Sequence, residues 1–353
     1  MAATQTRPAQ RLAGLDLARY LAFVGMVIVN FKIAMGAEGG TGLLSWLTGL
    51  LEGRAAATFV VLAGVGLGLS AQHEVFSQTF GVTLKRAVFL LALGLANMLI
   101  FDADILHYYA FYFLFAALLL PLTRRALAGV IVALNIAAVV MILTLNYDVG
   151  WDWEAYSYAD FWTPQGFVRN LVFNGWHPIV PWLGFMLFGI ILSRQALGEG
   201  AIQRRLLLGG GLAMAAAWGL SMVLTPIATA IDPELAALVT TSPVPPMPLY
   251  TLAGSGAASL TIGACLLLSD AAARWGVLRV ITPAGRQTLT LYIAQILLGM
   301  GTLEALGRLG GQSVGQAVTA ALLFCALATG YAWLWSRRFK RGPIEAVMRA
   351  LAG

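Results

Sequence analysis

Long apolar stretches follow one another along almost the whole chain, and short polar segments separate them. An apolar stretch of about 20 residues can cross the ~30 Å hydrocarbon core of a bilayer as a helix. The pattern predicts ten such helices, near residues 17–36, 53–70, 86–101, 105–120, 126–145, 177–193, 206–224, 249–269, 287–303 and 315–335. We therefore expect an all-α, polytopic transmembrane helix bundle, with residues 1–353 forming a single membrane domain.

Basic residues are distributed unevenly among the polar segments. If residues 1–16 are a cytoplasmic N-terminus, 18 of the 22 Lys and Arg residues fall in or beside cytoplasmic segments. Short loops rich in Lys and Arg stay on the cytoplasmic side of a membrane. We therefore expect both termini to be cytoplasmic in a multi-pass protein of the plasma membrane, which is the inner membrane of a bacterium. The net charge of +6 has the same origin, so we expect no nucleic-acid partner.

The composition excludes several classes of protein. Hydrophobic residues make up 59% of the chain and charged residues 11%, whereas soluble domains are about 25% charged. Cys265 and Cys325 both fall inside predicted helices, and no metal-ligand spacing occurs, so we expect neither a disulfide framework nor a metal site. The alternating glycines of Gly64–Gly68 lie inside a predicted helix and indicate close helix packing rather than a nucleotide-binding loop.

Two segments outside the predicted helices have a distinct character. The external loop at 146–176 is crowded with aromatic residues. Such a loop is typical of an interfacial aromatic belt, and a lid or sugar-stacking surface over an external site is the alternative. In the cytoplasmic tail 336–353, apolar residues recur at helical spacing after Gly342 and Pro343. This spacing predicts a short amphipathic helix that lies on the membrane lipid.

Polar and ionisable residues collect at the outer ends of the predicted helices. Such groups are costly to hold inside a bilayer, so they indicate a functional site. The members of this outer cluster come from distant parts of the sequence: Asn30, Arg54, Asp102, Asp104, His107, Asn174, Trp176 and His177. Convergent polar groups within a helix bundle are typical of a binding or catalytic site.

The outer cluster contains the parts of an acid–base site. Histidine exchanges protons near neutral pH, so His107 is the preferred catalytic base. Asp104, three residues earlier, would orient His107 from the same helix face, or would simply cap the helix. His177 is a second base, an acceptor ligand or a helix cap, and Asn30 is the oxyanion donor. These parts suit acyl transfer, and they suit a small-solute transporter or channel almost as well; a non-catalytic receptor is a third interpretation.

The remaining members of the outer cluster are candidate acceptor-binding residues: Arg54, Asn174, Trp176 and Asp102. Asn174 can equally cap the helix that follows it. Arg54 stands at a helix start, where a positive charge opposes the helix dipole. A carboxylate partner such as Glu52 or Asp102 would account for its position.

Six groups of motifs, in a consistent order, resemble one known family. They are Arg11–Arg19 running into Met26–Asn30, Gly53–Ala57 with Leu62–Gly64, Asp104–Ala110, Pro178–Trp182, Gly285–Tyr292 and Arg341–Glu345. The chain resembles the transmembrane acyltransferase superfamily, which includes heparan-α-glucosaminide N-acetyltransferase and the bacterial YeiB-like membrane proteins. The YeiB-like branch is the more similar of the two.

The resemblance implies a membrane enzyme that takes the acetyl group of cytoplasmic acetyl-CoA. It passes that group to a sugar or another small molecule with an amine or hydroxyl on the outer side. Arg19 and Arg286 are then the candidate contacts for the donor's phosphates, although Arg19 could also form a plain intrahelical pair with Asp16. Membrane lipid is a further expected partner, and a homodimer remains open.

One departure from the family pattern concerns the catalytic base. The related acetyltransferase carries its catalytic histidine shortly after the asparagine that corresponds to Asn30. No histidine occurs here between Asn30 and His73. If the chemistry is kept, His107 or His177 must supply the base, and either a direct transfer or an acyl-histidine intermediate is open.

Overall fold

The computed structural model describes residues 12–37, 39–72 and 74–353, so most of the expected N-terminal segment lies outside the described residues. The elements are α1 (Ala13–Ala34), α2 (Leu43–Gly49), α3 (Arg54–Ala71), α4 (Phe76–Asn97), α5 (Leu106–Leu119), α6 (Arg124–Thr144), β1 (Trp151–Asp152), β2 (Ser157–Tyr158), α7 (Pro164–Arg169), η1 (Asn170–Asn174), α8 (Ile179–Ser193), α9 (Gly200–Ile231), η2 (Pro233–Val239), α10 (Pro248–Arg274), α11 (Val277–Arg286), α12 (Thr288–Ala294), η3 (Gln295–Met300), α13 (Gly301–Ala305), α14 (Val314–Ser336) and α15 (Pro343–Ala352). The two short strands pair in antiparallel fashion. The predicted all-α fold class is confirmed.

Eight helices of the described chain are long and apolar enough to cross a membrane. A bent pair, Pro164–Asn174 and Ile179–Ser193, makes a ninth if it counts as one span. All ten predicted stretches are helical. The tenth, α5, has only 14 residues and is too short to be counted among these spans. Three helices extend by five or more residues beyond their predicted bounds: α4 begins at Phe76, α9 continues to Ile231, and α10 continues to Arg274. The added first part of α4 is rich in polar side chains such as Gln78 and Lys85, so hydropathy alone does not predict it, yet these residues do not interrupt the helix.

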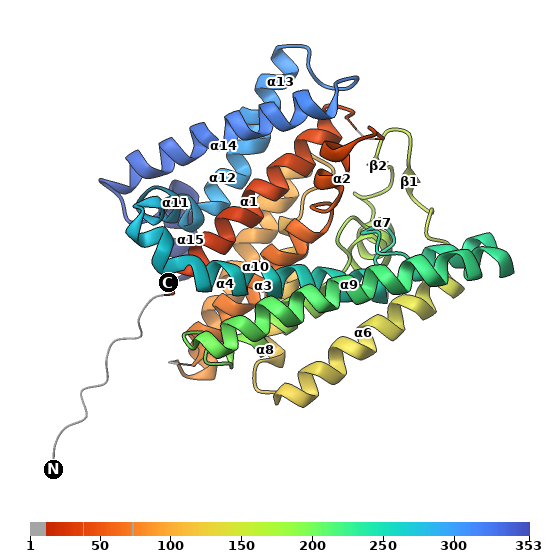
Figure 1. The fold of residues 1–353 in the computed structure, drawn as a ribbon, viewed down its shortest axis with the longest axis horizontal. Helices are drawn as coiled ribbons and strands as arrows, with labels where there is room; N and C mark the ends of the chain where they lie inside the picture. The colour runs from red at the N-terminus through yellow and green to blue at the C-terminus, as the bar shows by residue number, and fades with distance from the viewer. Residues whose placement is uncertain (1–11, 38, 73) are drawn as a thin grey trace.

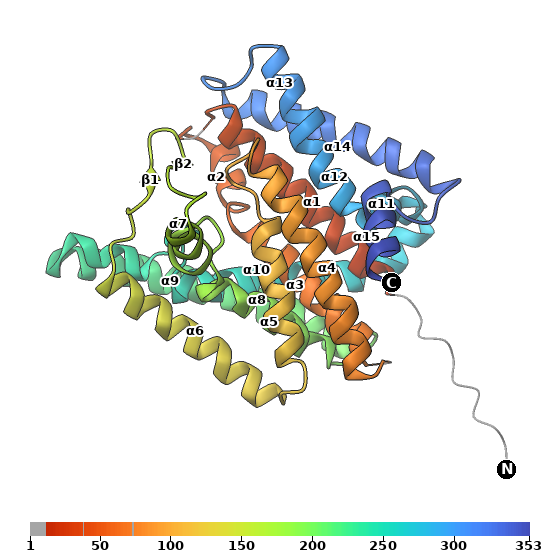
Figure 2. The same cartoon turned by 180° about the vertical axis from the view of Figure 1, so that it is seen from behind.

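Four helices, α1, α3, α8 and α10, form the centre of the bundle. In α3, 11 of 18 residues are buried, whereas only Gly210 and Ala217 are buried along the 32 residues of α9. Figures 1 and 2 show α6 and α9 along one edge of the bundle and α14 along the opposite edge. Exposed leucines and methionines on the outer helices suit contact with lipid, and the central helices position the polar residues. We name the end of the bundle at which α1 begins the inner end, following the predicted orientation.

The C-terminal helix α15 is fastened to the inner end of the bundle by one carboxylate. Glu345 Oε1 accepts hydrogen bonds from the backbone N–H groups of Leu289 at 2.8 Å and Thr290 at 3.1 Å. Its Oε2 accepts a third from Thr290 Oγ1 at 2.5 Å. Because the first N–H groups of a helix have no partner within that helix, Glu345 caps α12 from a distant part of the chain. The tail therefore belongs to the packed structure.

Replacing this carboxylate should loosen the tail. Glu345→Ala removes the charged acceptor of three hydrogen bonds, and one hydrogen bond to a charged group has a net worth of about 1.5–3 kcal/mol. We expect a loss of about 2 kcal/mol in the free energy of unfolding, measured by thermal or SDS-induced unfolding in detergent. Glu304→Ala, at an exposed position of α13, is the matched control and should change little. Equal stability of both variants would contradict the capping role.

Candidate functional site

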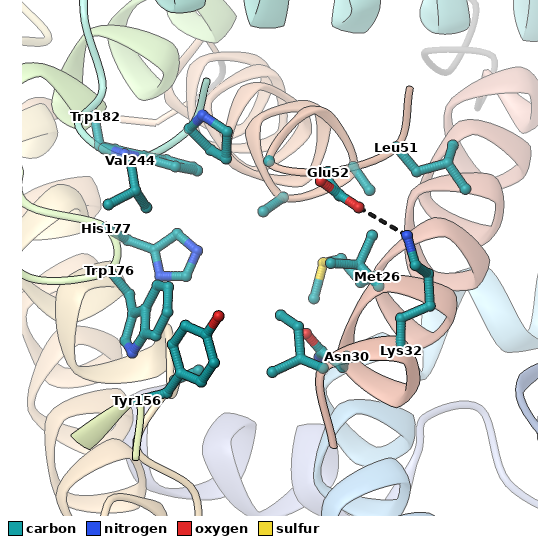
Figure 3. Close-up of a pocket in the computed structure, with 17 residues that line it drawn as sticks. Met26, Asn30, Lys32, Leu51, Glu52, Tyr156, Trp176, His177, Trp182 and Val244 are labelled. Atoms are coloured by element: carbon teal, nitrogen blue, oxygen red, sulfur yellow. Dashed lines mark hydrogen bonds and ion pairs between the residues drawn. The ribbon is translucent and has the colours of Figure 1, made fainter. Parts of the chain in front are cut away.

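A cavity of about 190 Å³, the outer cavity, lies at the outer end of the bundle (Figure 3). Its walls come from the outer half of α1, the turn between α2 and α3, the bend before α8, and the loops around Tyr156 and Val244. Of the residues predicted from the sequence, Asn30, Trp176 and His177 line it. Folding therefore brings these three predicted site residues together from two distant parts of the chain.

An ion pair forms one wall of the outer cavity. Lys32 Nζ lies 2.8 Å from Glu52 Oε1, and the side chain of Lys32 is only 6% exposed. A buried ammonium requires a partner of opposite charge, and the Glu52 carboxylate supplies that partner for Lys32. Figure 3 shows Asn30 beside this pair and His177 on the facing wall. Lys32 had no predicted role, although a lysine at the outer end of an apolar helix was the available signal.

His177 is held in the bend between η1 and α8. Its ring packs edge-on against Trp182 with 4.6 Å between the centroids, and Tyr112 Oη donates a hydrogen bond to its backbone carbonyl. Within the described chain, His177 Nδ1 and the indole nitrogens of Trp176 and Trp182 are buried without a hydrogen-bond partner. Buried polar atoms normally have a partner, so these three groups are suited to bind a polar ligand in the outer cavity.

The predicted pair of Asp104 and His107 is present, but it is enclosed. His107 Nδ1 lies 3.1 Å from Asp104 Oδ2, and both side chains are fully buried. Asp104 also accepts hydrogen bonds from Asn97 Nδ2 at 2.7 Å, Tyr292 Oη at 3.2 Å and the backbone N–H of Leu106 at 2.8 Å. Asp104 therefore both caps α5 and orients the imidazole. His107 is absent from the walls of the outer cavity, so its role as the base stays a prediction.

Asn174 shapes the external loop. Its Nδ2 donates hydrogen bonds to the carbonyls of Tyr147 at 2.7 Å and Val149 at 2.9 Å, and its Oδ1 accepts one from Tyr158 Oη at 2.7 Å. Burial raises the pKa of the Tyr158 phenol, which keeps the phenol protonated as a donor. Because the Asn174 amide is fully buried among these partners, it supports the wall of the site.

The aromatic residues of the external loop pack on one another. Trp151 and Trp153 stack with 4.4 Å between their centroids, and Trp176 meets Trp151 edge-on at 5.0 Å. This cluster carries Tyr156 and Trp176 into the wall of the outer cavity (Figure 3). The arrangement fits the interpretation of the loop as a lid over an external site.

Arg54 and Asp102 lie beside the outer cavity rather than in its wall. Arg54 Nη2 donates hydrogen bonds to Thr241 Oγ1 at 3.1 Å and to its carbonyl at 3.3 Å, and Nη1 donates to the Glu52 carbonyl at 3.3 Å. Among the described residues, Arg54 forms no ion pair with either of the two expected carboxylate partners, Glu52 or Asp102, and the Glu52 carboxylate is paired with Lys32. Asp102 is exposed, and its neighbour Ala103 lines the cavity instead.

A second cavity, the inner cavity, has a volume of about 290 Å³. Arg19 and Arg286, the predicted donor contacts, both line it, and so does Arg86 of α4. Asp16 forms salt bridges with Arg19 and Arg286. Arg19 Nη1 lies 2.7 Å from Asp16 Oδ1, and Arg286 Nε lies 3.2 Å from Asp16 Oδ2. The intrahelical pair of Asp16 and Arg19 therefore exists, and it leaves both guanidinium groups at the cavity wall.

Met26 of α1 lies in the wall of both cavities. The inner cavity and the outer cavity thus lie in series through the bundle, on either side of one side chain. Methionine is unbranched and has three rotatable bonds, so its side chain adapts readily to what is packed beside it.

Several residues of the two cavities were missed by the sequence analysis. Tyr156 and Trp182 of the outer cavity lie among many other aromatic residues, and Arg86 was counted only among the basic residues of the cytoplasmic side. Glu345 and Met348 place the tail in the wall of the inner cavity, although the tail was expected to serve as an anchor. Only the tertiary packing of α15 against α4 and α12 reveals this.

The outer cavity offers an imidazole, an ammonium, a carboxylate and a side-chain amide. Such a set can bind a small polar molecule and accept a proton from it. In the part of the chain that the structure describes, no group of three or more His, Cys, Asp and Glu residues could hold a metal ion.

Two family models match the chain. The model described as heparan-alpha-glucosaminide N-acetyltransferase, catalytic, matches residues 11–223, which include most of the outer cavity. The model described as protein of unknown function (DUF418) matches residues 191–353, which include Arg286 and α15. No curated protein matches the chain.

Proposed function

Because the chain belongs to the heparan-alpha-glucosaminide N-acetyltransferase catalytic family, we propose that it carries an acetyl group across a membrane, in bacteria the inner membrane. The donor is acetyl-CoA at the inner end, and the acceptor is an amine or hydroxyl at the outer end. The observation that carries this proposal is the position of Met26 in the wall of two cavities, one lined by arginines and the other by His177.

The inner cavity suits the donor. Arg19, Arg86 and Arg286 supply positive charge, and the Nε of Arg86 is buried without a hydrogen-bond partner among the described residues. Apart from the arginines, Thr288 and Glu345, the wall is largely apolar, with residues such as Phe23. The volume lies near the lower end of small-molecule sites. The cavity would therefore accommodate the narrow pantetheine arm, with the phosphates nearer the inner surface.

The outer cavity suits the acceptor. Glu52 can bind an amine, and Trp176 and Tyr156 can pack against the flat face of a sugar ring. His177 would accept the proton that the acceptor loses as its nitrogen or oxygen bonds to the acetyl carbonyl carbon. Asn30 would donate a hydrogen bond to the carbonyl oxygen, where negative charge develops. The carbon–sulfur bond then breaks, and the thiolate of CoA leaves and takes up a proton.

Transfer across a sealed membrane tests the proposal. Proteoliposomes would hold glucosamine as a probe acceptor in the lumen, and labelled acetyl-CoA, which does not cross lipid, would be added outside. We expect labelled N-acetylglucosamine in the lumen, without labelled acetyl-CoA there. Intact labelled acetyl-CoA in the lumen would instead indicate a transporter.

Blocking the junction between the cavities should stop this transfer. Met26→Trp places a bulky ring between donor and acceptor, and misplacing reacting groups by about 1 Å can cost about 100-fold in rate. We expect a loss of that order, with acetyl-CoA binding retained in a thermal-shift assay. Met222→Trp, at an exposed position of α9, is the matched control and should transfer normally. Full activity of Met26→Trp would show that the acetyl group does not pass this point.

A further inference from the structure

A third cavity, the tail pocket, lies at the inner end of the bundle between α4 and α15, with a volume of about 430 Å³. Its positive residues are Lys85, Arg86 and Arg349, and its hydrogen-bonding neighbours include Ser77, Gln78 and Thr79. All but Arg349 come from the first half of α4, in which the residues up to Lys85 were expected to form a loop. These residues line the pocket together with Arg349, because α15 packs against α4.

The positive charges of the tail pocket are poorly balanced by the protein. Arg349 and Arg341 both lie near enough to Arg86 to repel it, while Glu74 offers the main attraction. Glu74 is exposed, and its carboxylate makes only a long 3.5 Å contact with Thr79 Oγ1. Like charges that repel one another gain most from an anion placed between them.

Arg86 joins the tail pocket to the inner cavity, because it lies in the wall of both. Three cavities therefore follow one another through the molecule, with Arg86 at the first junction and Met26 at the second. The tail pocket is polar and basic, whereas the inner cavity beyond Arg86 is mostly apolar. A ligand with phosphates at one end and a slender, less charged arm at the other matches this sequence of surfaces.

We propose that the tail pocket binds phosphate groups, and specifically the 3′-phosphate and diphosphate of the acyl-CoA donor. This assignment rests on the proposed function, since it gives the donor of that reaction its nucleotide subsite. Arg349 makes α15 part of the donor site, and Glu345 holds α15 in place by capping α12. Arg86 lies at the point where the phosphates end and the pantetheine arm begins.

Comparing CoA with dephospho-CoA, which lacks only the 3′-phosphate, tests the proposal. Dissociation constants would be measured by calorimetry on the full-length protein in detergent. We expect the natural protein to prefer CoA by about tenfold, the worth of one charge-assisted contact to phosphate. Arg349→Gln should reduce the preference toward one, and Arg349→Lys should keep part of it. Arg279 is exposed and lies outside the inner cavity and the tail pocket, so Arg279→Gln should leave the preference for CoA unchanged.

Other outcomes separate the sources of phosphate and the two proposals. If Arg349→Gln weakens binding to phosphatidic acid vesicles but not to CoA, the pocket binds a lipid headgroup and the donor assignment is overturned. An unchanged preference for CoA in Arg349→Gln would overturn it as well. If the protein shows the expected preference yet transfers no acetyl group, the tail pocket stands and the proposed function fails. If acetyl transfer proceeds without any preference for CoA, the proposed function stands and the tail-pocket assignment fails.

Discussion

His177→Ala should lower the turnover of acetyl transfer about 100- to 10,000-fold, the range by which a positioned general base accelerates a reaction. The imidazole lines the outer cavity, opposite the ion pair of Lys32 and Glu52, and its Nδ1 has no hydrogen-bond partner among the described residues. Donor binding should persist, because the inner cavity lies on the other side of Met26. Turnover and acetyl-CoA affinity would be measured on the same purified protein.

Added imidazole provides the decisive readout for this variant. A space left by His177→Ala can admit free imidazole, which would restore part of the proton transfer if the side chain acts as a base. A purely structural role for His177 would give a loss that imidazole does not repair. The comparison requires unfolding curves to show that His177→Ala remains folded.

His107→Gln distinguishes the two histidines. Removing the imidazole leaves Asp104 with one partner fewer inside the protein, so we expect a less stable protein. Turnover per folded molecule should stay within about tenfold of the natural protein, because His107 is absent from the walls of the outer cavity. If His107→Gln abolishes turnover and His177→Ala does not, the base is the one expected from the sequence.

The fold could be predicted from the sequence because length and apolarity alone define a membrane-crossing helix. All ten stretches are helical in the structure, including α6 and α9, whose few buried residues give no packing signal. The short helices α2, α7 and α11 were not predicted, since seven, six and ten residues carry too little periodic signal. The boundaries of α4 were missed for another reason: its first half is polar because it faces the tail pocket.

The site could be predicted only in part, because burial depends on contacts between distant segments. The spacing of Asp104 and His107 correctly predicted their contact, although Asp104 precedes α5 and reaches His107 as a side chain that caps the helix. No local pattern could show that Phe161 of the external loop packs edge-on against His107 at 5.4 Å, while His177 remains at a cavity wall. The two histidines look alike in sequence, and only the packing of the loop separates them.

Gly64→Leu should destabilise the protein more than any surface substitution, and it should also reduce activity. A Cβ at Gly64 would lie 2.1 Å from the carbonyl oxygen of Met186, and one at Gly189 would lie 2.1 Å from that of Val61. The backbones of α3 and α8 therefore touch, which confirms the predicted role of the Gly64–Gly68 stretch in helix packing. Ordinary overpacking lowers the free energy of unfolding by about 1–3 kcal/mol, and we expect a larger loss when the backbones of α3 and α8 are forced apart.

Gly66→Ala is the matched control, because it lies on the same helix but away from this contact. Its Cβ would meet Arg19 Nη2 at 3.6 Å, an ordinary van der Waals distance. Alanine also favours the helix over glycine by up to about 1 kcal/mol. We therefore expect an unchanged or slightly raised melting temperature in detergent for Gly66→Ala, against a clear loss for Gly64→Leu. If both variants unfold alike, the packing of α3 on α8 is not what the glycines provide.

The close contact between α3 and α8 should also link the stability of the protein to its activity. The outer end of α3 supplies Ala55 and Ala56 to one wall of the outer cavity, and the start of α8 follows His177 on the other. Moving α3 away from α8 would therefore widen the cavity between the ion pair and the imidazole. For Gly64→Ala, the milder change, we expect acetyl-transfer turnover to fall at a temperature where the protein is still folded. Turnover that falls only in proportion to the folded fraction would contradict this coupling.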